Sequence, residues 1–212
     1  NSHKKLKNKE YTDDSLLVFE NGSKIKIIEG ELLNYKITDK NDLKMANKLH
    51  KPYKNIKVGQ GFDVHKFVKD KPLKIGGVLI DYDYGLEGHS DADVLIHSII
   101  DALLGASSLG DIGNHFPDTE EKFKDINSRE LLKEVIKKLK SNNYVVGNID
   151  ATIICEHPKM QSYIHQMKEN ISDDCMCDIT DINIKATTTE QLGFIGRSEG
   201  IAAQAICLIQ EV

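Results

Sequence analysis

The chain has 212 residues, of which 40% are hydrophobic and 29% are charged, so its length allows one domain with a sizeable core plus an extension, or two small domains. Its formal net charge of −5 argues against nucleic acid as a main partner, because nucleic-acid-binding domains usually carry a basic surface. No apolar run approaches the roughly 20 residues of a membrane span, and no secretory signal opens the sequence, so we expect no membrane partner.

Residues 1–54 differ from the rest of the chain because they are rich in Lys, Asn and Asp and show no pattern typical of catalysis. Asn21-Gly22 lies between short apolar runs and predicts a β-hairpin within Leu16–Glu29. For the whole of residues 1–54, we favour a mobile or partly ordered N-terminal extension over a folded piece of this kind. The compact domain is predicted to cover residues 55–212.

The compact domain opens with a predicted strand, Ile56–Phe62, which contains Gly59 and Gly61. Asp63-Val64-His65 follows it directly. Because alternate residues of a strand project from the same face, Asp63 and His65 should point the same way. A second short strand with a bend at its two glycines is predicted over Lys74–Ile80.

A long apolar helix is predicted next. The Ser-x-x-Asp pattern of Ser90–Asp93 is typical of a helix start with Ser90 as N-cap, and Gly105 is a typical end. Within this helix His97 and Asp101 are four residues apart, so their side chains can touch. A buried histidine bonded to a carboxylate is the more common explanation of such a pair, and the upstream Asp63 and His65 favour a metal ligand instead.

The later elements alternate between helices and strands. An amphipathic helix opens at 127–130, and a helix ending near Asn170 follows the strand Tyr144–Cys155. A further strand is predicted at Ile182–Thr187, and Ile201–Ile209 is a last apolar segment. This order predicts an α+β fold, with helices on one face of a mixed sheet.

Two groups of polar residues have the chemistry of a site. Asp63, His65 and His97 offer one carboxylate and two imidazoles, the three-ligand pattern of a catalytic zinc with an open position that can orient a phosphate oxygen. Thr187–Thr189 offers hydroxyl and backbone donors for phosphate, although consecutive threonines are also typical of a strand edge. Lys159 adds a positive charge, and Glu190 could hold a magnesium ion.

Nine motifs together resemble those of the 2-C-methyl-D-erythritol 2,4-cyclodiphosphate synthase family. In chain order they are GFDVH (61–65), GGV (76–78), HSDADV (89–94), DALLGA (101–106), LGDIG (109–113), FPDT (116–119), PKM (158–160), KATTTE (185–190) and LGF-x-GR-x-EGIA (192–202). They keep their order and natural gaps from Lys57 to Glu211, so the resemblance covers nearly the whole compact domain.

The resemblance implies a two-layer α+β sandwich that assembles as a homotrimer around a central cavity, with active sites shared between subunits. The implied reaction converts 4-diphosphocytidyl-2-C-methyl-D-erythritol 2-phosphate to the 2,4-cyclodiphosphate and CMP, in non-mevalonate isoprenoid synthesis. The implied cofactors are zinc and either magnesium or manganese. An isoprenoid diphosphate is the implied ligand of the central cavity.

The resemblance also assigns roles to residues, motif by motif. The zinc ligands would be Asp63, His65 and His97, and the catalytic set would also include Glu190, as ligand of the second ion, and Thr188. The methylerythritol phosphate side would involve His89, Ser90, Asp111, Gly113 and Asp118. The cytidine diphosphate side would involve Pro158, Lys159, Met160, Ala186, Thr187, Thr188 and Thr189. Phe194 and Arg197 would line the central cavity, together with Glu199.

Two other functions fit the same residues. The first is a zinc hydrolase in which the open position carries water, and the second is a non-catalytic trimer that binds a polyprenyl diphosphate near Phe194 and Arg197. For location, the Lys/Asn-rich extension resembles the remainder of a plastid-targeting leader, which predicts an apicoplast-type plastid. A free, bacterial-type cytoplasmic enzyme is the alternative.

Overall fold

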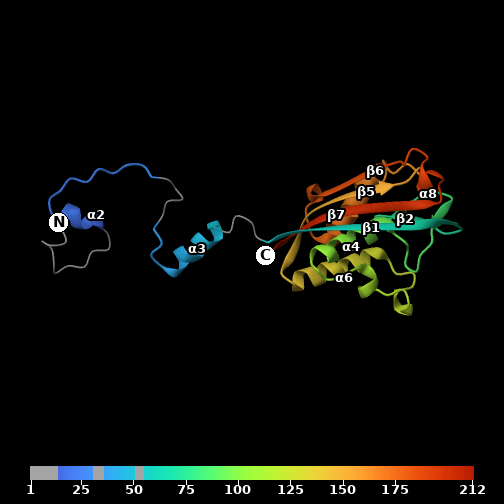
Figure 1. Ribbon diagram of the computed structural model, residues 1–212, viewed down its shortest axis with the longest axis horizontal. Helices are drawn as coiled ribbons and strands as arrows, with labels where there is room; N and C mark the ends of the chain where they lie inside the picture. Colours follow the sequence, from blue (N-terminus) through green and yellow to red (C-terminus); the bar gives the residue numbers. More distant parts are fainter. Residues whose placement is uncertain (1–13, 31–35, 51–54) are drawn as a thin grey trace. The chain divides into compact units, whose positions relative to one another are not determined.

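The computed structural model describes residues 14–30, 36–50 and 55–212. Contacts within the chain group its residues into two units, Asn1–Pro52 and Tyr53–Val212 (Figure 1). The first unit contains helices α2 (Asp14–Glu20) and α3 (Lys40–His50).

The hairpin predicted within Leu16–Glu29 is wrong. Asn21 and Gly22 instead end helix α2, where the Gly22 N–H donates to the Phe19 carbonyl at 2.9 Å. Gly22 has a φ of +83°, and a glycine in this region terminates a helix as readily as it turns a hairpin. In the described residues 23–30 no strand follows.

The second unit is built on a five-stranded sheet, which confirms the predicted α+β class with a mixed sheet. Its strands lie in the order β4-β1-β7-β5-β6, and only β5 and β6 are parallel neighbours. Their bounds are β1 Ile56–Lys69, β4 Tyr84–Leu86, β5 Tyr144–Ile154, β6 Ile182–Thr187 and β7 Gly200–Glu211.

Three long helices pack against this sheet: α4 (Val94–Ala106), α6 (Ser128–Ser141) and α7 (Ile164–Cys175), with α4 and α6 on the same side of it (Figure 1). Shorter helices are α5 (Ile112–His115), α8 (Gly193–Gly196), η1 (Glu121–Phe123) and η2 (Ile179–Asp181). The face of β1 and β7 turned away from α4 exposes apolar side chains, namely Val58, Phe62, Val64 and Ile206. In the part of the chain that the structure describes, no helix is long and apolar enough to cross a membrane.

Helix α4 lies directly on strand β1 because two glycines of the strand face it. A Cβ atom added to Gly61 would lie 2.0 Å from the Ser98 carbonyl oxygen, and one added to Gly59 would lie 1.9 Å from that of Ala102. No side chain fits at either place, so helix and strand backbones are in contact. His97 immediately precedes Ser98 on α4, so this approach places it beside Asp63 and His65.

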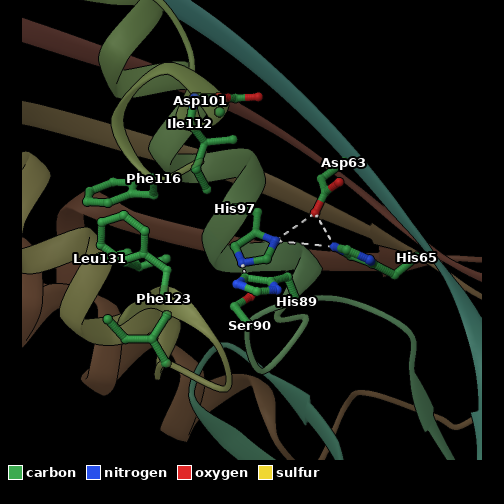
Figure 2. A pocket seen from close by; sticks show the side chains of 12 residues that line it. Asp63, His65, His89, Ser90, His97, Asp101, Ile112, Phe116, Phe123 and Leu131 are labelled. Atoms are coloured by element: carbon green, nitrogen blue, oxygen red, sulfur yellow. Dashed lines mark hydrogen bonds and ion pairs between the residues drawn. The ribbon is translucent and has the colours of Figure 1, made fainter. Parts of the chain in front are cut away.

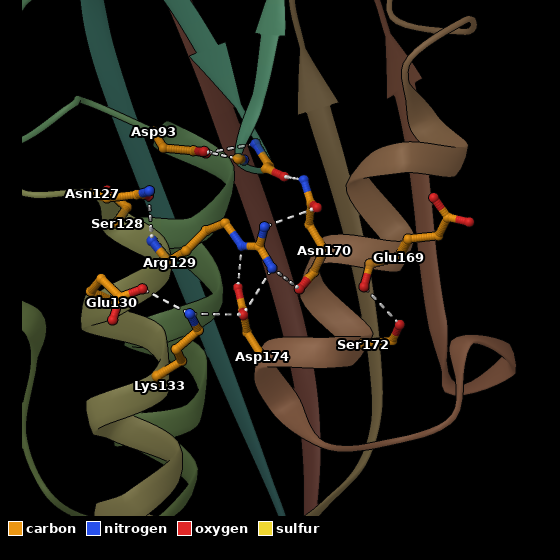
Figure 3. Close-up of polar contacts among 12 residues, drawn as sticks. Asp93, Asn127, Ser128, Arg129, Glu130, Lys133, Glu169, Asn170, Ser172 and Asp174 are labelled. Atoms are coloured by element: carbon orange, nitrogen blue, oxygen red, sulfur yellow. Dashed lines mark hydrogen bonds and ion pairs between the residues drawn. The ribbon is translucent and has the colours of Figure 1, made fainter.

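Asp93, rather than the predicted Ser90, is the N-cap of α4. Its carboxylate accepts the Ile96 N–H at 3.1 Å and also the N–H groups of Gly76 and Gly77 at 2.9 and 2.7 Å (Figure 3). These glycines form the turn of a hairpin between β2 (Leu73–Ile75) and β3 (Val78–Ile80), not a bend in one strand. Burial raises the pKa of Asp93 to about 6, against the effect of the backbone donors. The other end of α4 also differs, because the helix continues through Gly105 to Ala106.

A second polar network fixes the start of α6. The Arg129 guanidinium donates to both carboxylate oxygens of buried Asp174, at 2.6 and 3.0 Å, and to Asn170 Oδ1 at 3.0 Å. Asn170 in turn donates to the Gly76 carbonyl at 3.0 Å (Figure 3). The first turn of α6 is therefore tied to α7 and to the β2–β3 hairpin.

We predict that Gly61→Ala destabilises the protein, because the new methyl group must push α4 away from β1. Overpacking of this kind costs about 1–3 kcal/mol, measured as a lower urea midpoint. Gly105→Ala is the matched control, since a Cβ atom there meets nothing within 4 Å and alanine favours the helix. Equal urea midpoints for the two variants would contradict the close approach of α4 to β1.

Candidate metal centre and adjoining pocket

The structure brings the predicted ligands Asp63, His65 and His97 together at the junction of β1 and α4 (Figure 2). Asp63 Oδ2 lies 3.0 Å from His65 Nε2 and 3.0 Å from His97 Nδ1. The two imidazole nitrogens are 3.3 Å apart. The three atoms therefore form a compact triangle.

The other nitrogen of each imidazole is also engaged. His65 Nδ1 donates to the Glu87 carbonyl at 2.6 Å, and His97 Nε2 lies 2.9 Å from the Ser128 hydroxyl oxygen. Metal-binding histidines usually have such outer partners, which fix the orientation of the ring.

The spacing of the three atoms fits a zinc ion. Two ligands of a tetrahedral zinc with bonds of about 2.0 Å lie about 3.3 Å apart, close to the three separations found here. A fourth position on such an ion would be left open, because the described residues place only these three potential ligand groups within reach of one another.

The pKa values of Asp63 and His65 are each shifted by their contacts within the triad. Burial by itself would raise the pKa of Asp63, but hydrogen bonds with His65 and His97 outweigh it and hold that pKa well below its usual range. Burial lowers the pKa of His65, and the contact with Asp63 more than reverses this, so the net change is upward. Asp63 is consequently an ionised carboxylate, which is the form that a metal requires.

A pocket of about 220 Å³ adjoins the triad (Figure 2). Its polar end holds the triad with His89 and Ser90, and Gly113 also lines it; the resemblance assigned these three residues to the methylerythritol phosphate side. The opposite wall is apolar and consists of Ile112, Phe116, Phe123, Ile126 and Leu131. No sequence pattern predicted this wall as a whole, although the FPDT motif contains one of its residues, Phe116.

Two acidic residues assigned to the same side lie outside this wall. Asp111 caps the short helix α5 by accepting the Asn114 N–H at 2.9 Å, and it is exposed. Asp118 is exposed in the following loop. Neither is among the residues that line the pocket in the described chain.

The contact expected between His97 and Asp101 does not form as a hydrogen bond. Asp101 Oδ1 accepts the Ile112 N–H at 2.7 Å, while His97 is engaged by Asp63 and Ser128. Burial raises the pKa of Asp101. The residue still lines the pocket, so it belongs to the site without being paired as the helical spacing suggested.

The residues assigned to cytidine diphosphate gather beyond the ends of β5 and β6, which are parallel neighbours. Thr188 donates to Glu190 Oε1 at 2.7 Å, and the Thr189 N–H donates to Glu156 Oε1 at 2.9 Å. Pro158, Lys159, Ala186 and Thr187 lie in the same region with accessible side chains, whereas that of Met160 is buried. In the described chain none of these residues lines the pocket beside the triad.

Phe194, assigned to the central cavity, lines a second hollow of about 490 Å³. Val64, His65 and Glu199 are among its other lining residues. Arg197 is exposed, and its Nε donates to Glu199 Oε1 of the same chain at 2.7 Å. His65 thus lies between the metal pocket and this hollow.

Known proteins similar to this chain include two curated bacterial enzymes. It is 58% identical over 156 residues to a 2-C-methyl-D-erythritol 2,4-cyclodiphosphate synthase of Methylobacillus flagellatus, a match that covers 74% of this chain and 98% of the relative. It is 48% identical over 204 residues to a bifunctional enzyme IspD/IspF of Desulfotalea psychrophila, which covers 94% of this chain and 53% of the relative. The chain therefore spans about half the length of that bifunctional relative.

The bifunctional match corrects the predicted plastid location. It covers 94% of this chain, so it extends well into residues 1–54, and its source is bacterial. The Lys/Asn-rich extension consequently resembles part of a bacterial bifunctional protein, not the remainder of a targeting leader. Composition alone could not distinguish a targeting leader from part of a bifunctional protein, because either can contain a solvated, lysine-rich segment.

The fold comparison agrees with the sequence comparison. A solved structure described as IspF of Plasmodium falciparum in complex with CDP superposes with a TM-score of 0.66 at 34% identity, covering 75% of this chain and 98% of that one. The model of the YgbB family matches residues 56–210, which include every motif quoted above. The chain therefore belongs to the YgbB family, and this confirms its predicted resemblance to the 2-C-methyl-D-erythritol 2,4-cyclodiphosphate synthases.

Proposed function

We propose that this chain cyclises 4-diphosphocytidyl-2-C-methyl-D-erythritol 2-phosphate to 2-C-methyl-D-erythritol 2,4-cyclodiphosphate with release of CMP. The observation that carries the proposal is the Asp63/His65/His97 triangle at the polar end of a pocket of about 220 Å³. A pocket with a cation site at one end and an apolar wall at the other suits a small branched polyol phosphate. The name of the Methylobacillus relative supports the same reaction.

The reaction is an intramolecular phosphoryl transfer. An oxygen of the 2-phosphate forms a bond to the β-phosphorus, the bond from that phosphorus to the bridging oxygen breaks, and CMP leaves with the electron pair. The obstacles are the mutual repulsion of three phosphoryl groups and the freedom of the chain between them. The protein therefore has to position and neutralise the substrate, and no protein nucleophile is needed.

Each group of residues has a part in this positioning. Asp63, His65 and His97 would hold zinc, which supplies positive charge to phosphate oxygens when bound. His89 and Ser90 would bind the methylerythritol phosphate, with Asp111, Gly113 and Asp118 nearby. Lys159 and the threonine run would bind the cytidine diphosphate, and Glu190 would hold magnesium or manganese.

We also propose that the active site is shared between the subunits of a homotrimer. Two observations support this: the cytidine residues do not line the metal pocket of the described chain, and the sheet exposes Val58, Phe62, Val64 and Ile206 on a face that a neighbour could cover. In such a trimer Phe194 and Arg197 would border a central cavity able to take an isoprenoid diphosphate.

Phosphorus NMR of the protein incubated with substrate, zinc and magnesium tests the proposed reaction. Appearance of a cyclic diphosphate together with CMP is the expected result. Inorganic phosphate or an opened product would instead identify a metal hydrolase, and an unchanged spectrum with bound ligand would identify a binding protein.

We predict that His97→Ala removes both bound zinc and activity, because two remaining ligands hold zinc far more weakly than three. Zinc per chain, measured by elemental analysis after gel filtration, should fall from about one to below about a tenth. His165→Ala is the control, since that imidazole is 80% exposed and pairs only with Glu169 in the described structure. Full zinc content in His97→Ala would exclude the site.

Complementation between two inactive variants tests the shared site. His97→Ala destroys the metal half and Thr188→Trp blocks the cytidine half, so each variant alone should be inactive. In trimers refolded from an equal mixture, one interface in about four joins two intact halves, and about a quarter of wild-type activity should return. Trimers shown by mass spectrometry to be mixed yet still inactive would place each site within one chain.

A further inference from the structure

Ser128 connects the metal triad to a carboxylate outside the pocket. Its side chain is completely buried, and its hydroxyl oxygen lies 2.9 Å from His97 Nε2. The same hydroxyl donates to Asp91 Oδ1, whose other oxygen accepts from Lys74 Nζ at 3.0 Å. Neither Ser128 nor Asp91 is among the residues that line the metal pocket. His97 is the pocket residue that the Ser128 hydroxyl contacts.

The direction of these hydrogen bonds follows from what each group can do. A carboxylate only accepts, so the single hydroxyl proton of Ser128 is committed to Asp91. The Ser128 oxygen then offers only lone pairs to His97, which must donate from Nε2. In the neutral imidazole the proton on Nε2 leaves Nδ1 with a free lone pair, and Nδ1 is the nitrogen that faces Asp63 and His65.

We propose that Ser128 and Asp91 are positioning residues that hold His97 in the Nε2-protonated tautomer and thereby prepare Nδ1 for the metal. The inference rests on the proposed metal site and adds the source of its pre-organisation. An uncommitted hydroxyl would stabilise either tautomer, and with the proton on Nδ1 the imidazole could not bind the ion until that proton moved.

The other hydroxyl near His97 does not have this property. Ser90 Oγ lies 3.2 Å from His97 Nε2 and accepts the Ala92 N–H at 3.2 Å. Among the described contacts, no carboxylate accepts the hydroxyl proton of Ser90. Ser90 also lines the metal pocket. Ser90 can therefore donate or accept, whereas Ser128 can only accept from His97.

The surrounding structure holds the pair in place. The Ser128 N–H also donates to Asp91 Oδ1, at 3.1 Å, so the serine and the carboxylate share two hydrogen bonds. The next residue, Arg129, anchors the same helical turn to Asp174 and Asn170 (Figure 3). The position of the Ser128 hydroxyl is thus fixed from both sides.

Zinc affinity of the full chain, measured by competition with a chromophoric chelator, tests the proposal. Ser128→Ala should weaken zinc binding about 10- to 100-fold, the usual effect of losing an outer partner of a ligating histidine. Ser98→Ala is the matched control, because that serine is equally buried, lies beside His97 on α4 and donates only to the Leu95 carbonyl at 2.8 Å. Its zinc affinity should equal that of the wild type.

A second variant and a spectroscopic measurement separate positioning from a general loss of structure. Asp91→Asn preserves size but frees the Ser128 proton, so it should also weaken zinc binding, and the double variant should lose less than the product of the two single effects. In zinc-free protein the Asp63 carboxylate lies 3.0 Å from His97 Nδ1 and favours a proton on that nitrogen. Imidazole ¹⁵N shifts should therefore show Nε2 of His97 protonated in the wild type, where Ser128 accepts its proton, and partly unprotonated in Ser128→Ala.

The outcomes are distinguishable. Wild-type affinity in both Ser128→Ala and Asp91→Asn, or an unchanged His97 tautomer in Ser128→Ala, would overturn the positioning role while leaving the metal site intact. Absence of zinc binding in the wild type would instead refute the metal site itself. If Ser128→Ala does not fold, the affinity and the tautomer of Asp91→Asn decide the matter.

Discussion

The contact between the backbones of α4 and β1 is the constraint on which the site depends. Gly59 and Gly61 allow the helix to lie on the strand without intervening side chains. The ligands then converge because Asp63 and His65 continue the same face of β1, while His97 immediately precedes Ser98, the residue of α4 whose carbonyl meets Gly61. A larger residue at either glycine would separate helix from strand by roughly the width of a methyl group, and a site built on contacts of 3.0–3.3 Å could not tolerate that displacement.

Much of this arrangement could be predicted from local patterns. Strand alternation was sufficient to place Asp63 and His65 on one face, and the apolar periodicity of α4 located His97 on a buried helix. The mixed sheet followed from the order of the elements. Capping rules were less reliable. Ser90 and Asp93 both have suitable side chains, and the choice between them was made by Gly76 and Gly77, whose N–H groups reach Asp93 from a hairpin distant in the sequence.

The remaining features depend on which loops meet in space. The apolar wall comes from α5, η1 and α6, and no pattern in the sequence indicated that Phe123 and Leu131 would face one pocket. Asp101 and Ser128 both make contacts that sequence spacing did not predict. The former bonds the Ile112 N–H, although helical periodicity pointed to His97, and the latter contacts His97 from a helix that appeared to be only amphipathic.

Alternate residues of strand β1 belong to two different faces of the sheet. Gly59, Gly61, Asp63 and His65 face α4, whereas Val58, Phe62 and Val64 form the exposed apolar face. Because the period is two, inserting or deleting a single residue within 58–65 would exchange the two sets, turning ligands outward and valines toward the helix. A substitution on one face need not affect the other, but both faces depend on the same alternation of residues along the strand. Variation in the length of this segment should accordingly be far rarer among functional relatives than variation in the identity of its outward-facing residues.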